Sequence, residues 1–349
     1  MTSISIWPMR VRWRPWVFLM SLVLTVVTVL LVAISIGEGD YSLSPWRVLQ
    51  LLSGAPGREI EQAVVFGWRL PRALTGVAAG AALGIAGAIF QNVTRNPLAS
   101  PDILGITSGA SAAAVTVITL GSSSSNALVM WLAEAGIPLA ALCGAVITAL
   151  AMWMLAWKRG IDTYRLVLYG IVISALLHAY IRLLLVRAHI RDAATAQLWL
   201  SGSIANASWQ RSLPLFVLII VIVPALAWAT FTLSALALGD TTAMALGLRL
   251  GPAHAGLLGL AVALTAVAVS AAGPIGFIAF VAPQVALRLS RRPTPPLYAS
   301  AATGSALLLL ADIITRLLPR ELPVGLVTST IGGIFLIYIL IHQSRKVGL

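Results

Sequence analysis

The sequence is short of charge. Only 10% of its 349 residues are Asp, Glu, Lys or Arg, whereas 59% are hydrophobic. A soluble globular domain carries roughly 25% charged residues, so this composition excludes a protein solvated mainly by water. Lysine is the rarer cation, present only as Lys158 and Lys346, and neither follows the glycine of a GxxxxGK[ST] loop. The chain therefore lacks the loop by which P-loop proteins bind ATP.

Cysteine and acidic residues are also scarce. The single cysteine, Cys143, lies in an apolar run, so no intramolecular disulfide forms and nothing follows about redox compartment. Asp and Glu number 11 against 23 Lys and Arg, a net charge of +12. The cations lie in short loops between apolar runs and form no continuous basic face for nucleic-acid phosphates. This pattern is typical of a membrane protein under the positive-inside rule, and it argues against nucleic-acid binding.

Long apolar runs dominate the chain. A helix of about 20 apolar residues crosses the hydrocarbon core of a bilayer. The sequence predicts an all-α integral membrane protein with about ten spans, near residues 16–36, 69–91, 103–121, 138–157, 164–186, 213–234, 254–272, 275–290, 299–318 and 324–343. The first run exceeds the roughly 7–15 apolar residues of a signal peptide, which favours a retained anchor. The third is rich in Gly, Ala and Ser, and the eighth is short. No linker divides residues 1–349, so one membrane domain is predicted.

The distribution of cations predicts the orientation. An even number of spans places both termini on one side. With the termini inside, thirteen Lys and Arg residues fall in inner segments, nine in outer segments, and Arg182 within a span. The bias is modest and favours inner termini. The nine outer arginines require an explanation of their own.

The second span carries a stripe of small residues: Gly76, Gly80, Gly84 and Ala88 recur at four-residue spacing. Such a stripe lets a neighbouring helix backbone approach closely, which favours van der Waals packing between helices in a membrane. Packing within the chain is the simpler interpretation, and a subunit interface is the alternative.

A proline-broken segment, Asn96-Pro97-Leu98-Ala99-Ser100-Pro101-Asp102, follows the second span. Two prolines four residues apart forbid a continuous helix. Irregular backbone at membrane depth is tolerated only where it is buried in protein or lines an aqueous cavity. The segment is therefore either an ordinary loop or a constriction of a pathway.

A short helix is predicted at residues 241–246, between the sixth and seventh spans. Asp240 suits the N-cap and Gly247 the position after the C-cap. A helix of under two turns is marginal alone and needs something to pack on. It is either a docking element for a soluble partner or an interfacial helix without one.

Ionisable residues within the spans are few. Asp312 and Arg316 are four residues apart and can pair on one helix face. His178 and Arg182 share that spacing; Arg182 can snorkel to the outer boundary, or the two can line a pathway that attracts an anionic solute. A gradient-driven carrier usually shows acids in mid-membrane. An unpowered channel or a subunit powered by another chain fits better, with a stand-alone carrier and a membrane scaffold as alternatives.

Several motifs together resemble the FecCD family of ABC-transporter permeases, which import iron–siderophores, haem and vitamin B12. They cover nearly the whole chain: Arg69-Leu70-Pro71-Arg72; residues 84–91 leading into Asn96-Pro97-Leu98-Ala99-Ser100-Pro101 and Leu104-Gly105; Leu198-Trp199 with Gly202-Ser203; Leu238-Gly239-Asp240 with Ala245-Leu246-Gly247; Gly273-Pro274-Ile275-Gly276-Phe277-Ile278 with Ala282-Pro283; Ala311-Asp312; and Glu321-Leu322-Pro323-Val324-Gly325. Residues 160–163 and the ending Gln343-Ser344-Arg345-Lys346 most resemble the ferric-enterobactin permease subunits. One departure is Gln284, where many relatives have His.

The resemblance implies a type II importer permease fold with ten spans and inner termini, in the bacterial inner membrane. It implies a transport subunit that catalyses no reaction itself. Its partners would be a second permease subunit of related but different sequence, two ABC ATPase subunits that hold ATP and Mg, and a periplasmic siderophore-binding protein. No cofactor or metal is expected on this chain.

The resemblance also implies roles for particular residues. The segment Gly239, Asp240, Thr241, Ala245, Leu246 and Gly247 would dock into the ATPase. Asn96, Pro97, Leu98, Asp162 and Thr163 fall where the family closes its cytoplasmic gate. Arg58 and Arg316 would pair with glutamates of the binding protein, which would explain part of the outer arginine excess.

Overall fold

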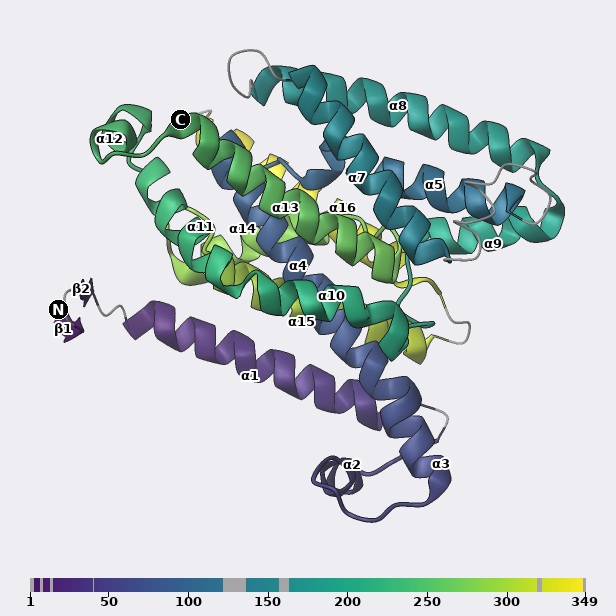
Figure 1. The fold of residues 1–349 in the computed structure, drawn as a ribbon. Helices are drawn as coiled ribbons and strands as arrows, with labels where there is room; N and C mark the ends of the chain where they lie inside the picture. The colour runs from purple at the N-terminus through teal and green to yellow at the C-terminus, as the bar shows by residue number, and fades with distance from the viewer. Residues whose placement is uncertain are drawn as a thin grey trace.

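The computed structural model describes residues 3–6, 9–12, 15–39, 41–121, 136–156, 163–318 and 322–347. The described chain is a bundle of helices (Figure 1). One feature was not predicted: an antiparallel hairpin of β1 (Ser3–Ile6) and β2 (Met9–Arg12) precedes the first span. The membrane part is all-helical, as expected.

Seven helices are long and apolar enough to cross a membrane, among the residues described. They are α1 (Pro15–Gly37), α4 (Leu70–Thr94), α7 (Ile137–Ala156), α8 (Thr163–Arg187), α13 (Leu250–Ala272), α15 (Leu297–Leu317) and α16 (Val324–Val347). An eighth span is the pair α10 (Trp209–Val221) and α11 (Val223–Leu236), bent by 53°. The shorter α5 (Ile106–Leu120) and α14 (Ile278–Ser290) correspond to the third and eighth predicted spans.

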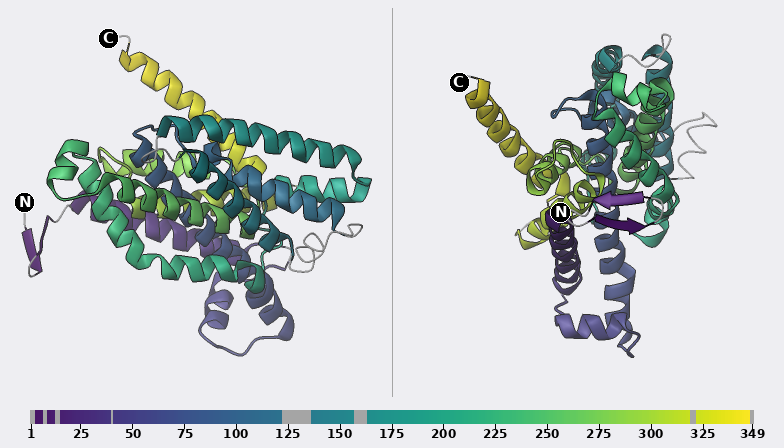
Figure 2. Two further views of the ribbon diagram at one scale, coloured as in Figure 1. Left: turned by 45° about the horizontal axis from the view of Figure 1, so that its top comes forward. Right: turned by 90° about the vertical axis from the view of Figure 1, so that its left-hand side faces the viewer.

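The bundle has two distinct ends. At one end, α2 (Pro45–Leu52) and α3 (Glu59–Gln62) form a projecting lobe; at the other lies α12 (Asp240–Ala245) (Figure 1). We call these the α2 end and the α12 end. Both termini lie toward the α12 end (Figures 1 and 2), as an even number of spans requires. α9 (Ile190–Leu200) follows α8 near the α2 end.

The helix that begins in the lobe is too long for the membrane. α3, the π-helical η1 (Ala63–Arg69) and α4 run without a break over Glu59–Thr94, which is 36 residues. At about 1.5 Å per residue this is about 54 Å, whereas the hydrocarbon core of a bilayer is about 30 Å thick. α2, α3 and the segment around them therefore stand outside the membrane.

α4 lies at the centre of the bundle and packs against α13, α14 and α15. The predicted small-residue stripe makes this possible. A methyl group added at Gly80 or Gly84 would overlap the backbone of Gly304 or Ser300 on α15. The stripe is therefore buried within the chain, and the interpretation of packing inside the monomer is confirmed.

Candidate functional site

The short helix α12 forms one residue earlier than predicted. It begins at Asp240, and Gly239, with φ +96°, occupies the N-cap position that the sequence assigned to Asp240. At its other end Gly247 has φ +87° and donates to the Met244 carbonyl (2.9 Å), while Leu248 donates to the Ala243 carbonyl (3.0 Å). This is the Schellman arrangement that favours glycine, so the prediction for Gly247 is confirmed. Because Asp240 is not the cap, its carboxylate is available for another partner.

α12 exposes apolar side chains. Only Ala243 of the helix is buried, whereas Thr241, Ala245 and Leu246 are exposed together with Leu238 and Met244. An exposed apolar cluster on a helix of six residues is the kind of surface that a protein partner covers.

The partner of Asp240 is Arg95, at the end of α4. Arg95 has φ +50°, caps α4, and donates to the Asp240 carboxylate at 2.6 Å. The next residue is Asn96, the first of the predicted gate. An ion pair between residues 145 apart in sequence thus joins the predicted coupling helix to the predicted gate.

The gate segment itself is a compact turn. The Asn96 side-chain oxygen accepts from the Leu98 N–H (2.9 Å), as expected of an Asn before a proline-broken loop. Pro101 then begins the 3₁₀ turn η2 (Pro101–Leu104), which packs against α8. Burial raises the pKa of the Asp102 carboxyl, whereas hydrogen bonds from Thr107 and Ser100 act to lower it.

Of the other predicted gate residues, Asp162 lies outside the described residues, and Thr163 is the first residue of α8. α8 is the helix on which η2 packs. The gate roles of Asn96, Pro97, Leu98, Asp162 and Thr163 stay predictions.

His178 and Arg182 lie one turn apart on α8, and both are exposed. His178 Nε2 is 3.2 Å from Ser108 Oγ of α5. Their exposure suits residues that line a pathway formed with another subunit, which stays a prediction. In the described part of the chain, no three His, Cys, Asp or Glu side chains are grouped so as to hold a metal ion.

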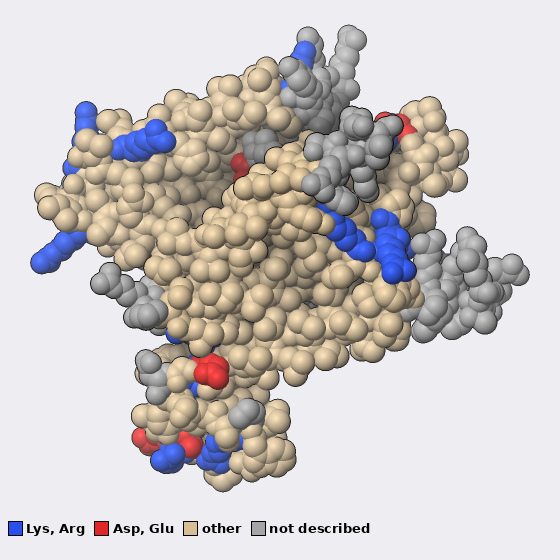
Figure 3. All heavy atoms as spheres, turned by 180° about the vertical axis from the view of Figure 1, so that it is seen from behind, with Lys and Arg blue, Asp and Glu red and all other residues tan. Residues whose placement is uncertain are grey.

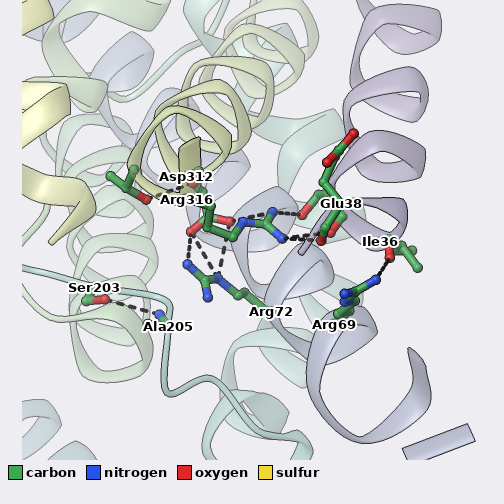
Figure 4. Close-up of polar contacts among 10 residues, drawn as sticks. Ile36, Glu38, Arg69, Arg72, Ser203, Ala205, Asp312 and Arg316 are labelled. Atoms are coloured by element: carbon green, nitrogen blue, oxygen red, sulfur yellow. Dashed lines mark hydrogen bonds and ion pairs between the residues drawn. The ribbon is translucent and has the colours of Figure 1, made fainter. Parts of the chain in front are cut away.

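A buried ion cluster lies near the α2 end. Asp312 is 1% exposed and pairs with Arg316 at 3.0 Å, which confirms the predicted structural pair on α15. It also accepts a two-pronged contact from Arg72 of α4, at 2.9 Å from Nη2 and 3.1 Å from Nε (Figure 4). The pairing of Arg72 with Asp312 was not predicted, because no spacing rule relates two residues that are 240 positions apart on different helices.

Arg316 also caps the end of α1, together with a further arginine, Arg69. The last carbonyls of a helix have no partner within it, and guanidinium groups satisfy them here. Arg316 donates to the Ser35 carbonyl (2.8 Å), and Arg69 donates to those of Ile36 (2.9 Å) and Gly37 (3.1 Å) (Figure 4). Cations at this position also oppose the negative end of the helix dipole.

A third group of charges orders the lobe. Glu61 accepts from Arg47 at 2.6 Å and from Arg58 at 3.1 Å. The hydrogen bond from Arg47, with the Arg58 backbone N–H, lowers the pKa of Glu61 from 4.5 to about 2. Much of the outer arginine excess thus has a structural explanation.

The two predicted docking arginines differ in placement. The Arg58 side chain is 74% exposed on the lobe, whereas that of Arg316 is 13% exposed and occupied by Asp312 and α1. The burial of Arg316 is incompatible with contact to a separate protein, so the docking prediction is kept for Arg58 alone.

Distant motifs meet at the α2 end. Gly202, with φ +68°, packs on the carbonyl of Pro274, and its own carbonyl accepts from the Gly325 N–H at 3.1 Å. Elsewhere, Gln284 donates to Gln91 at 2.7 Å in a buried pair between α14 and α4. The departure at position 284 therefore has a polar partner inside the bundle.

Comparisons with known proteins agree over most of the chain. A family model described as the FecCD transport family matches residues 25–342. The ferric enterobactin transport system permease protein FepG of Escherichia coli (strain K12) is 40% identical over 311 residues, covering 88% of this chain and 91% of that protein. The achromobactin transport system permease protein CbrC of Dickeya dadantii (strain 3937) is 39% identical over 333 residues, covering 93% and 91%. A solved structure described as an inward-facing metal-chelate type ABC transporter has a TM-score of 0.79 at 26% identity, covering 93% of this chain and 99% of that one.

Proposed function

Since the chain belongs to the FecCD transport family, we propose that it is the permease subunit of an importer that moves a ferric siderophore across the bacterial inner membrane. It is a multi-pass transport subunit and not itself the ATPase. Both termini and α12 face the cytoplasm in this proposal, and the α2–α3 lobe faces the periplasm. The observation that carries it is the joining of α12 to the gate segment through Arg95 and Asp240 (2.6 Å).

The proposed assembly has four kinds of chain. A second permease subunit of different sequence completes the pathway, two ATPase subunits bind ATP and Mg, and a periplasmic siderophore-binding protein delivers the substrate. The lobe with its exposed Arg58 receives the binding protein. The exposed apolar cluster on α12 docks into an ATPase subunit.

The coupling step follows from this arrangement. ATPase movement displaces α12, and the Asp240 carboxylate moves the Arg95 guanidinium with it. Arg95 is the residue before Asn96 in the chain, so no flexible segment lies between the ion pair and the gate residues Pro97 and Leu98. The gate then opens a path beside α8, where His178 and Arg182 offer polar groups to an anionic ferric chelate.

A catecholate siderophore of the enterobactin type is the proposed substrate. The support is the 40% identity to a permease named for ferric enterobactin. Vitamin B12 and haem are the alternatives within the family, and a stand-alone carrier is the alternative outside it.

Two measurements test the proposal. A deletion strain is grown under iron limitation with single purified siderophores or with vitamin B12; rescue by enterobactin but not by B12 is expected, and a defect confined to B12 use would overturn the substrate assignment. Uptake is then measured in proteoliposomes with and without the ATPase. Transport by the permease chains alone would overturn the importer mechanism.

A further inference from the structure

A second candidate site lies on the surface formed by α7 and α13. A groove of about 420 Å³ runs along the surface between α7 and α13, and every residue that lines it is apolar or glycine. Its lining includes Val146, Leu150 and Trp153, which are 43%, 52% and 45% exposed, so the groove opens at the protein surface. α13 and α16 lie on opposite faces of the bundle (Figure 2, right). The opposite face of the molecule, seen from behind, is also mostly uncharged across its middle (Figure 3).

The length of the groove suits a single acyl chain. Its lining on α13 runs from Ala255 to Val267, which is about 18 Å at about 1.5 Å per residue. Half of a hydrocarbon core of about 30 Å is about 15 Å. The lining residues of α7 run from Leu142 to Trp153, on both sides of the middle of that helix, so the groove crosses the middle of the membrane.

A cation stands beyond the groove at headgroup level. Arg249 is the exposed N-cap residue of α13, six residues before Ala255, or about 9 Å along the helix axis. It has no acidic partner among the residues that the structure describes. Basic residues at the ends of spans attract anionic lipid headgroups on the cytoplasmic side.

We propose that the α7–α13 groove binds one acyl chain of an anionic phospholipid, with the headgroup at Arg249. The apolar lining selects a hydrocarbon chain, the length suits a single acyl chain, and Arg249 selects a negative headgroup. The inference rests on the proposed orientation, in which the α12 end faces the cytoplasm, and not on the transported substrate.

Gly259 makes the site testable without disturbing the fold. It lines the groove, and a Cβ added there would meet no atom within 4 Å. Leucine at this position fills the groove instead of displacing protein atoms. Gly333 of α16 is equally open and lies outside the groove, so Gly333→Leu is the matched control.

The experiment measures phospholipid retained by the assembled transporter. The complex is purified from nanodiscs containing equal phosphatidylglycerol and phosphatidylcholine, and bound lipid is counted by native mass spectrometry. Gly259→Leu is expected to lower retained phosphatidylglycerol about tenfold, equivalent to about 1.4 kcal/mol, whereas Gly333→Leu retains the wild-type amount. Arg249→Gln is expected to keep a bound lipid but lose the preference for phosphatidylglycerol.

Four results would overturn the proposal. Equal retention by Gly259→Leu and Gly333→Leu would exclude the groove, and an unchanged headgroup preference in Arg249→Gln would exclude the anionic lipid. A photoreactive residue at Leu150 is expected to cross-link to lipid. Its cross-linking to the second permease subunit, or a groove holding detergent only, would also refute the assignment.

Discussion

Removing the carboxylate of Asp312 tests the buried ion cluster most directly. Asp312 is 1% exposed, and the side chains of Arg72 and Arg316 are 16% and 13% exposed. In Asp312→Asn, two guanidinium groups remain together with no compensating charge. Breaking a buried ion pair by removing one partner costs about 3–5 kcal/mol. At about 1.4 kcal/mol per tenfold, this is a loss of about two to three and a half powers of ten in the folded-to-unfolded ratio.

The assay is denaturant unfolding of the purified protein in detergent micelles, followed by tryptophan fluorescence. Glu59→Gln is the matched control because it also removes one acid but on the exposed face of the lobe, and it is expected to fall within about 0.5 kcal/mol of wild type. Adding Arg72→Met to Asp312→Asn restores the net charge of the cluster, since Arg316 keeps its acceptors on α1.

The double variant is therefore expected to be more stable than the sum of its single changes by about 0.5–3 kcal/mol. This stabilising role of the Asp312 carboxylate is refuted if Asp312→Asn is no less stable than Glu59→Gln. It is also refuted if the effects of Arg72→Met and Asp312→Asn simply add, since that would mean that the charges do not interact.

Three further predictions concern coupling, pH and packing. Arg95→Glu is expected to lower ATP-dependent uptake about tenfold or more while the complex still assembles. Adding Asp240→Arg reverses the charges of the pair and is expected to restore uptake. If the double variant does not regain uptake, the Arg95–Asp240 contact has no role in coupling. Because the pKa of Glu61 is lowered from 4.5 to about 2, the lobe gains stability from this carboxylate above about pH 4.5 and loses it as the pH falls toward 2. Hydrogen exchange of residues 41–62, corrected for intrinsic rates, is expected to become faster as the pH falls over this range. A Glu61→Gln variant with the same pH dependence would show that Glu61 is not responsible. Gly84→Val is expected to destabilise the protein by about 1–3 kcal/mol through overlap with Ser300, measured as above, whereas equal stability of Gly84→Val and Gly333→Val would contradict the packing of α4.

The spans could be predicted from the sequence because the membrane imposes a single length on an apolar helix. The two runs with the weakest signal, at residues 103–121 and 275–290, are the two helices that the structure makes short, α5 and α14. α5 begins directly after Gly105 and α14 directly after Phe277, and the positive φ of these two residues sets where each helix starts. The bend between α10 and α11 was not predicted, although Pro224 in the first turn of α11 is compatible with it.

The candidate site was predictable only in pieces. Local rules identified α12 and the proline-broken segment, since a cap glycine and two prolines act on their immediate neighbours. The Arg95–Asp240 and Arg72–Asp312 pairs were not predictable, because they depend on which helix ends meet in three dimensions. Burial was equally inaccessible: Arg316 resembled a docking residue by position, yet it lies inside the bundle between Asp312 and Ser35.

The uninterrupted helix from Glu59 to Thr94 has an arginine at each end: Arg58, the predicted docking residue, is its N-cap, and Arg95, the partner of Asp240, is its C-cap. The chain thus contains one stiff helix through the whole membrane, which in the proposed assembly connects the lobe that receives the binding protein to the α12 segment that docks into the ATPase. Because the helix is stiff, a tilt of one end moves the other end. The π-helical η1 has a different hydrogen-bonding pattern and is the section at which this helix can bend. In the proposed assembly, docking of a loaded binding protein would therefore move the ATPase end of this helix before any substrate has entered the pathway.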